Sequence, residues 1–430
     1  MELGEGASVA TIKVDPDKYL KAKVTKVRFK GIYRACREKK EIDPDDWHWP
    51  AGKPDGYKKS KKAVVYQVKK DKTPAATVML KIDSKGMSGN GKFTGTIGKL
   101  VFEGQTPLAS GTHEVTVTLK ETPESLHWAR GMMTWEIDAG EHAALAGATQ
   151  VELFFVFDDP ASTKFFDPDG VWIEALRFIF KEARLEGAKQ IKEGLGKVTQ
   201  CCFELPQHKY EINEGAPGFG GFKGSFALGD YMKPKSLAVN CYDQTYAVIV
   251  FSGALGITMR GLYVEPFGYL KLTNLVGWGS CNNPFPETKF RKEKRNMVDA
   301  GKSSIEINAL KKENYLVVDV RDPARSPFGN HMFCEHLTNI YDACAGAALG
   351  KYDRTGYLLE CVDTVIPESG KYGNPSTREE IEKSGREKVV DYRGIKREHA
   401  GKTYSVNTEV KIVVDGIAQV KFVADVVEVK

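Results

Sequence analysis

The feature that most constrains the fold is an alternation of apolar and polar residues, with a period close to two, from residue 21 to residue 158. This period places successive side chains on opposite faces of a β-strand. Turn-forming segments such as Ser88-Gly89-Asn90-Gly91 interrupt the alternation, and about seven short strands at this spacing are typical of an antiparallel sandwich. We therefore predict an N-terminal antiparallel β-sandwich with strands at residues 21–33, 63–69, 76–82, 97–102, 113–120, 133–137 and 151–157.

The pattern changes after residue 160. Apolar residues recur at intervals of three and four between residues 172 and 183, which predicts an amphipathic helix. Further strands are expected at residues 261–265, 315–321, 331–336, 340–344 and 355–362, and a β-hairpin around Asp415-Gly416. We predict an α+β chain of three parts: a sandwich for targeting, delivery or binding (1–160), a catalytic domain (161–370), and a charged linker with a β-hairpin extension (371–430).

The charge of the chain is small overall but uneven. The net charge is +5 over 430 residues, and residues 1–72 hold 19 Lys and Arg against 11 Asp and Glu. A lysine cluster at residues 58–62 is most simply a solvated loop, and we expect no nucleic-acid partner. We also expect no membrane span, because no stretch reaches about 18 apolar residues. Residues 1–14 lack a signal-peptide pattern and the eight cysteines lack disulfide spacing, so we expect synthesis in the cytoplasm with reduced thiols.

One cysteine stands in a chemically distinctive position. The sequence Asn240-Cys241-Tyr242-Asp243-Gln244 precedes an apolar run over residues 246–255, whose length and small residues favour a buried helix with Cys241 in its first turn. Unpaired N–H groups and the helix dipole stabilise a thiolate at such a position and can also bind an oxyanion. Cys241 is therefore a candidate nucleophile, and Asp243 and Gln244 are expected to contact the local backbone or groups of a substrate-lining loop.

A thiolate needs a general base, and the base needs an acceptor that fixes its tautomer. Strand alternation over residues 331–336 places His331 on one face, and Asp342 lies on the next predicted strand. A turn at Leu337-Thr338 would put Asp342 diagonal to His331 and within reach of its side chain. A turn at Thr338-Asn339 is chemically the better pair and would instead place Asp342 opposite Glu335, too far from His331. Both registers remain open at this point.

These residues resemble the transglutaminase-like branch of the papain-like cysteine enzymes, over roughly residues 165–365. His331-Met332-Phe333-Cys334-Glu335 is similar to the His-x-Trp-x-Glu strand of that family, with Phe333 in the tryptophan position, and Tyr341-Asp342-Ala343 resembles its aspartate strand. The resemblance implies Cys241 as nucleophile, His331 as base and Asp342 as orienting acid. It does not identify the upstream oxyanion donor, for which Gln207 and Trp278 are the candidates considered.

The same residues also fit a zinc site or a disulfide. His331, Cys334, His336 and Cys344 are residue types that bind zinc, although alternation turns His331 away from Cys334 and His336. A disulfide between Cys334 and Cys344 is a second possibility. The glycine-rich segment 213–229 contains no dinucleotide or Walker motif, which favours a mobile or substrate-lining role. We expect neither a cofactor nor a metal.

The predicted function is cysteine-dependent acyl transfer at an amide bond, as a protease, amidase, deamidase or transglutaminase-type enzyme. The substrate would be a protein or peptide-like molecule, peptidoglycan included. By analogy, a β-rich module joined to such a domain would suit a bacterial effector or toxin exported by a specialised secretion system, with delivery machinery or an immunity protein as partner. The alternative is a noncatalytic binding or structural protein with a degenerate papain-like core.

Overall fold

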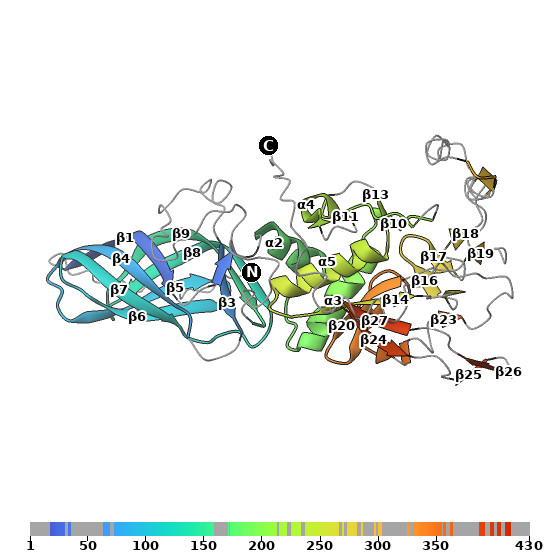
Figure 1. Ribbon diagram of the computed structural model, residues 1–430. Helices are drawn as coiled ribbons and strands as arrows, with labels where there is room; N and C mark the ends of the chain where they lie inside the picture. Colours follow the sequence, from blue (N-terminus) through green and yellow to red (C-terminus); the bar gives the residue numbers. More distant parts are fainter. Residues whose placement is uncertain are drawn as a thin grey trace, which may run out of the picture. The chain divides into compact units, whose positions relative to one another are not determined.

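The structure is a computed structural model in which the chain divides into two compact units, Met1–Val156 and Phe157–Lys430 (Figure 1). It describes residues 18–30, 33–35, 63–68, 73–158, 171, 173–212, 215–221, 225–233, 237–265, 269–270, 273–281, 285–286, 296–297, 300–302, 325–326, 331–354, 356–357, 362–363, 387–391, 396–399, 402–405 and 409–413. The lysine cluster at 58–62 and the strand expected at 315–321 lie outside these residues.

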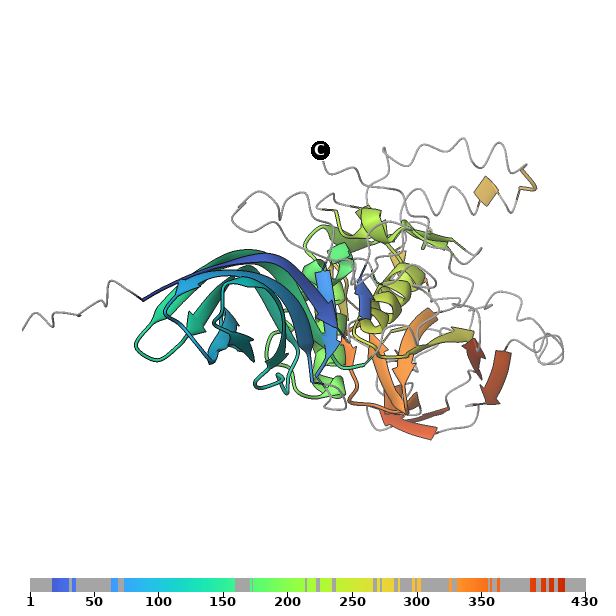
Figure 2. The same cartoon turned by 90° about the vertical axis from the view of Figure 1, so that its left-hand side faces the viewer.

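The described residues of the first unit form one continuous sheet of nine strands. They are β1 (Tyr19–Lys30), β2 (Tyr33–Ala35), β3 (Ala63–Gln67), β4 (Ala75–Lys85), β5 (Asn90–Ile97), β6 (Leu100–Pro107), β7 (Gly111–Leu119), β8 (His127–Asp138) and β9 (Ala143–Val156). Their order is β1-β4-β7-β6-β5-β8-β9-β3-β2, and the sheet curls until β1 lies near β9 (Figure 2). All neighbours are antiparallel except β3 and β9, which are parallel.

This arrangement corrects two sequence predictions. The strands form one curled, nearly closed sheet and not two sheets packed as a sandwich, because alternation fixes the face of each side chain but not the partner of each strand. The strand expected at 97–102 instead spans the end of β5, a tight turn and the start of β6: Ile97 pairs with Leu100, and Gly98 between them has a φ of +54°. The segment read as a turn at 88–91 ends inside β5.

Large aromatic side chains fill the inside of the curled sheet. Trp135 is fully buried and stacks on Phe93 with ring centroids 5.2 Å apart, while its indole N–H donates to Thr149 Oγ1 at 2.7 Å. Gly95 lies under this indole, and a Cβ atom there would come within 2.3 Å of the Trp135 ring. Glycine at this position therefore makes room for the largest buried side chain among the described residues of the unit.

The second unit combines helices with a mixed set of sheets. Its helices are α2 (Ile173–Glu182), α3 (Ile191–Glu204), α4 (Leu228–Tyr231) and α5 (Cys241–Ala254). The main sheet contains β22 (Ala348–Leu349), β21 (Asn339–Asp342), β20 (His331–His336), β14 (Arg260–Glu265), β27 (Glu409–Val413) and β24 (Glu387–Asp391), in that order.

Six two-stranded sheets complete the described part of this unit. They are β10 (His208–Tyr210) with β13 (Leu237–Val239), β11 (Gly220–Gly221) with β12 (Ser225–Phe226), β15 (Tyr269–Leu270) with β23 (Val362–Asp363), β16 (Thr273–Leu275) with β17 (Gly279–Cys281), β18 (Phe285–Pro286) with β19 (Arg325–Ser326), and β25 (Lys396–His399) with β26 (Lys402–Ser405). The first pair is parallel and the others are antiparallel.

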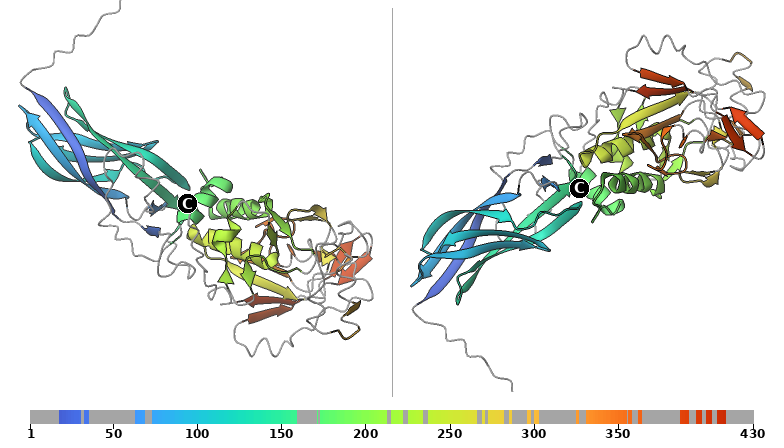
Figure 3. Two further views of the ribbon diagram at one scale, coloured as in Figure 1. Left: turned by 90° about the horizontal axis from the view of Figure 1, so that it is seen from above. Right: turned by 90° about the horizontal axis from the view of Figure 1, so that it is seen from below.

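The apolar helix α5 forms the centre of the second unit. It is buried on every side, and it contacts β20 as well as α2 and α3; α3 lies alongside it in the views of Figure 3. The run at 246–255 correctly predicted this helix. Helix α3 was missed because Gly194 and Gly196 interrupt its apolar pattern, and glycine disfavours helix interiors by about 1 kcal/mol. The packing of Leu195 and Val198 in the core outweighs that cost.

The C-terminal strands β24 and β27 join the main sheet, where β27 pairs with β14. The second arm of the hairpin expected around Asp415-Gly416 lies outside the described residues. The strand expected at 355–362 is wrong at its start, where the structure has a helical turn at Arg354, Gly356 and Tyr357. Among the described helices, none has both the length and the apolar character needed to cross a membrane.

Candidate active site

Cys241 is the first residue of α5. The side chain of Asn240 accepts hydrogen bonds from the N–H groups of Tyr242 (2.9 Å) and Asp243 (3.1 Å), and Asp243 Oδ2 accepts one from the N–H of Asn240 (3.1 Å). This reciprocal capping box fixes the residue at which the helix begins. It therefore fixes the position of the Cys241 side chain, which is 3% exposed.

Asp243 also holds the glycine-rich segment 213–229 against this end of α5. Its two carboxylate oxygens accept hydrogen bonds from the N–H groups of Gly218 (2.7 Å) and Phe219 (2.9 Å). A Cβ atom at Gly218 would lie 2.1 Å from the carbonyl oxygen of Ala238, so only glycine fits without a backbone shift. The expectation that Asp243 contacts local backbone is confirmed by its bond to the N–H of Asn240, and the same side chain bonds two residues of the glycine-rich segment to the first turn of α5.

The β20–β21 hairpin adopts the less favoured of the two registers considered. His336 pairs with Asn339, so the turn is Leu337-Thr338, and Leu337 takes a left-handed φ of 56°. A non-glycine residue is uncommon in this conformation. The register places Asp342 diagonal to His331 on the same face of the hairpin.

His331 and Asp342 are directly bonded. The His331 Nε2 atom lies 2.9 Å from Asp342 Oδ2, and both side chains are buried. Asp342 accepts further hydrogen bonds from the Tyr357 hydroxyl on the same Oδ2 atom (2.5 Å) and from the N–H groups of Cys344 (2.7 Å) and Ala345 (3.3 Å) on Oδ1. The carboxylate is thus held by four donors, and its orientation toward the ring is fixed.

The surroundings of His331 favour its charged form. Burial lowers the pKa of the ring, but the charge and hydrogen bond of Asp342, together with the interaction with the Cys241 side chain, raise the pKa to about 9. With Nε2 engaged by Asp342, Nδ1 is the ring nitrogen that can exchange a proton with a thiol. The structure therefore brings together all three residues expected from the sequence.

Gln244 joins three backbone segments around the same site. Its Nε2 group donates to the carbonyl oxygens of Cys202 (2.9 Å) and Ala343 (2.8 Å), and its Oε1 atom accepts from the Tyr231 hydroxyl (2.7 Å). Because Ala343 directly follows Asp342, this amide ties the aspartate strand to α5 and α3. Gln244 therefore has a bracing role that the sequence indicated only as local backbone contact.

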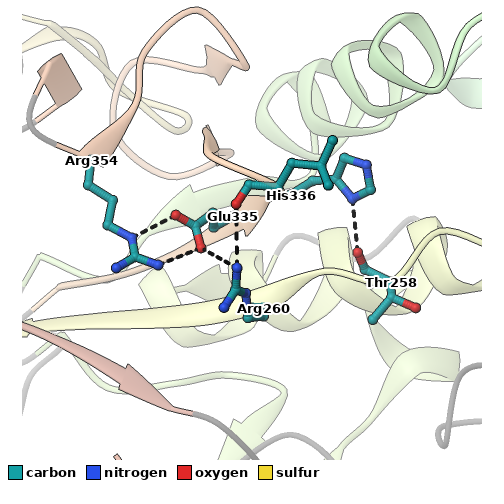
Figure 4. A network of polar contacts seen from close by, with 6 residues as sticks. Thr258, Arg260, Glu335, His336 and Arg354 are labelled. Atoms are coloured by element: carbon teal, nitrogen blue, oxygen red, sulfur yellow. Dashed lines mark hydrogen bonds and ion pairs between the residues drawn. The ribbon is translucent and has the colours of Figure 1, made fainter. Parts of the chain in front are cut away.

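Glu335, at the other end of β20, forms a buried ion pair (Figure 4). Its carboxylate accepts two hydrogen bonds from Arg354, at 2.6 and 2.7 Å, and lies 3.3 Å from Arg260. The neighbouring His336 is turned away from it, and its Nδ1 atom lies 3.0 Å from the carbonyl oxygen of Thr258. Bidentate pairing fixes a guanidinium in one orientation, so Arg354 anchors the helical turn that carries Tyr357.

The other cysteines do not support the alternatives weighed from the sequence. Cys334 and Cys344 are free thiols, so no disulfide joins them, and burial raises the pKa of each. Cys334 contacts the Thr245 carbonyl oxygen at 3.4 Å. Within the described part of the chain, no group of three His, Cys, Asp or Glu side chains is arranged to hold a metal ion.

Of the two candidate oxyanion donors, Trp278 has its indole N–H committed elsewhere, because it donates to the carbonyl oxygen of Tyr210 at 3.0 Å. The side chain of Gln207 is partly exposed. Tyr357 and Arg354 were not singled out from the sequence. The signal available for them was Asp353, whose Oδ1 atom accepts from the N–H of Gly356 at 2.7 Å, as a residue at a helix start does.

Comparisons with known proteins give limited information about this chain. No protein-family model matches the sequence, and no curated protein matches it. Among solved structures, it is similar to red sea bream transglutaminase, with 10% sequence identity and a TM-score of 0.30 over 66% of this chain. The chain spans 46% of the length of that protein.

Proposed function

We propose that the second unit is a cysteine-dependent acyl-transfer enzyme acting on amide bonds. The observation that carries the proposal is the bond of 2.9 Å between His331 Nε2 and Asp342 Oδ2, on a ring that also interacts with Cys241. A nucleophile, a base and a group that orients the base form the minimal set for this chemistry. Cys241 would be the nucleophile, His331 the base and Asp342 the orienting group.

In the proposed reaction, His331 Nδ1 already holds the proton of the Cys241 thiol, so the pair reacts as thiolate and imidazolium, and the sulfur attacks the carbonyl carbon of an amide. The C–N bond then breaks, the amine leaves with the proton held by His331, and a thioester remains on Cys241. Water resolves the thioester in hydrolysis or deamidation, and a second amine resolves it in crosslinking. In every case the enzyme returns to its starting protonation state.

The substrate we propose is a protein or peptide-like molecule, because the reacting group is an amide. The first unit would serve as a targeting or binding module.

Thiol labelling tests the nucleophile without knowledge of the substrate. The full chain is treated with iodoacetamide at neutral pH, and modification of each of the eight cysteines is followed by peptide mass spectrometry. We expect Cys241 to react fastest, and His331→Gln to slow its reaction by at least about tenfold. Cys202→Ala is the matched control, because Cys202 is a buried free thiol. Labelling of Cys241 that is no faster than that of the other thiols would reject the nucleophile.

Activity is then assayed with a glutamine-rich protein and a fluorescent primary amine. Amine incorporation reports crosslinking, ammonia release reports deamidation, and new chain termini report proteolysis. Cys241→Ala should reduce any of these by at least about 10³-fold while the thermal transition stays close to that of the wild type. Activity retained in Cys241→Ala contradicts the proposed mechanism, and reactive thiols without any activity favour a noncatalytic role.

A further inference from the structure

We infer that Tyr357 is a positioning residue of this site, whose hydroxyl competes with His331 for one oxygen of Asp342 and so sets the proton affinity of the imidazole. The inference deepens the proposed function, since its consequence for catalysis depends on Cys241 and His331 acting as described. Its physical core, the coupling of Tyr357 to His331 through Asp342, can be measured without any activity.

The geometry of Asp342 carries the inference. The Tyr357 hydroxyl and His331 Nε2 meet the same atom, Oδ2, at 2.5 and 2.9 Å, while the backbone donors of Cys344 and Ala345 occupy Oδ1. The two side-chain donors therefore share the charge of a single oxygen. The Tyr357 side chain is fully buried, so bulk water does not compete for this bond.

The Tyr357 hydroxyl is held in place from two directions. Its ring packs on Phe333 with centroids 4.5 Å apart, and Phe333 lies two residues from His331 on β20. Its backbone N–H donates to the Asp353 carbonyl oxygen at 2.8 Å, in the helical turn that Arg354 anchors to Glu335. A side chain braced in this way donates from a fixed position.

The charged and titratable groups around His331 determine the direction in which the loss of the Tyr357 hydroxyl should shift the pKa of His331. Asp342 is the carboxylate bonded to the ring, and Cys241 is the thiol that interacts with it. The nearby thiols of Cys334 and Cys344 stay protonated at neutral pH, because burial raises the pKa of each. Removing a neutral donor from Asp342 Oδ2 leaves more of its charge to the imidazolium, so the pKa of His331 should rise.

The test uses the full chain with ¹³C,¹⁵N-labelled histidine, in which His331→Gln identifies the His331 signal among the eight histidines. In Tyr357→Phe, we expect the pKa of His331 to rise by about 0.5–1 unit, the shift that corresponds to one net hydrogen bond. The alkaline limb of any acyl-transfer pH profile should move up by the same amount. An unchanged His331 titration in folded Tyr357→Phe would overturn the inference.

A second substitution reverses the sign and tests the inference if the phenylalanine variant does not fold. Replacing Tyr357 by 3-fluorotyrosine makes the phenol a stronger donor with little change in volume, and the pKa of His331 should then fall. No shift, or a rise, in a folded fluorotyrosine protein would also contradict the inference. Tyr66→Phe is the matched control, because it removes the hydroxyl of a buried tyrosine that donates to the Ala75 carbonyl oxygen in the first unit and not to a group of this site. It should leave the His331 titration unchanged.

These measurements separate the two proposals. If Cys241 proves unreactive but Tyr357→Phe shifts the His331 titration, then the coupling exists and the proposed function fails. If Cys241 is reactive and catalytic but neither Tyr357 variant shifts the titration, then the function stands and the positioning role fails.

Discussion

The curled sheet of the first unit and the α5–β20–β21 centre of the second unit bury their polar groups very differently. In the described part of the sheet, the buried polar residues are Thr77, Thr106, Thr149 and Glu152. The described part of the second unit buries Thr199, His208, Asn240, Asp243, Gln244, Thr245, Ser252, His331, Glu335 and Asp342. Most of the ionisable side chains among them lie at the N-terminus of α5 or on the β20–β21 hairpin.

Burying charged groups costs free energy unless hydrogen bonds and partners compensate. The second unit meets that cost with a capping box, a bidentate arginine and four donors to Asp342. Strongly perturbed groups of this kind concentrate at functional sites more than in purely structural cores. We therefore expect substitutions in the aromatic core of the first unit to act on stability, and substitutions in the polar core of the second unit to act on the proposed chemistry.

The largest expected effect on stability comes from the aromatic core of the sheet. Trp135→Ala removes a fully buried indole that stacks on Phe93, and we expect a loss of about 3–5 kcal/mol in the free energy of unfolding of that unit. Chemical denaturation followed by tryptophan fluorescence and circular dichroism measures it.

Trp135→Phe is the control, because it keeps an aromatic ring and should cost less. At temperatures where Trp135→Ala remains folded, Cys241 in this variant should be labelled at the same rate as in the wild type. A slower rate in folded Trp135→Ala would show that the aromatic core of the first unit also affects the reactivity of Cys241.

The sequence predicted the centre of the site better than its surroundings. Cys241 was identifiable because a capping pair, Asn240 and Asp243, directly precedes a long apolar run, so both the helix and its first residue follow from local rules. The pairing of His331 with Asp342 required the Leu337-Thr338 turn, which local preferences disfavour at Leu337. Long-range contacts decided that register, and no local rule contains them.

Tyr357 and the sheet topology show the same limit at longer range. The Tyr357 hydroxyl reaches an acceptor 15 residues away from a helical turn, where alternation suggested a strand. In the first unit, alternation predicted most of the strands but not that they would close into one sheet, because strand partners depend on packing of the whole core. Features set by neighbouring residues, such as the start of α5, could be predicted from the sequence. Contacts between distant segments, such as that of Tyr357 with Asp342, could not.

Two buried histidines of the second unit give the next prediction, because their surroundings shift the pKa of each in opposite directions. Burial lowers the pKa of His208 to about 4, and its nearest rings are Tyr231 and Phe219. Asp342 overcomes the effect of burial at His331 and raises the pKa to about 9. Because the pKa of His331 is higher in the folded protein than in the unfolded chain, His331 stabilises the folded protein below about pH 6.5. This contribution disappears as the pH rises to 9. Because the pKa of His208 is lower in the folded protein than in the unfolded chain, His208 destabilises the folded protein as the pH falls from about 6.5 to 4.

The free energy of unfolding should therefore fall on both sides of neutrality, each side through a different histidine. In the wild type, the free energy of unfolding should fall by a value on the order of 3 kcal/mol between about pH 6.5 and 9, and His331→Gln should abolish this fall. His208→Gln should make the fall below about pH 6 smaller. Urea titrations at several pH values measure both. If His331→Gln instead flattened the acid side, the assignment of the two histidines would be wrong.

The smallest expected effect compares an exposed ion pair of the sheet with the buried one beside the site. Lys92 lies 2.9 Å from Glu103, with both side chains substantially exposed, whereas Glu335 is 2% exposed against Arg354. Water and salt screen the first pair, so Lys92→Met should change the free energy of unfolding only slightly, and about 1 M salt should abolish the difference. Arg354→Met should cost more, and its cost should persist in salt, because Glu335 would keep a buried charge without its bidentate partner. Equal salt sensitivity in the two variants would show that the polar core of the second unit is no better shielded from solvent than the surface of the sheet.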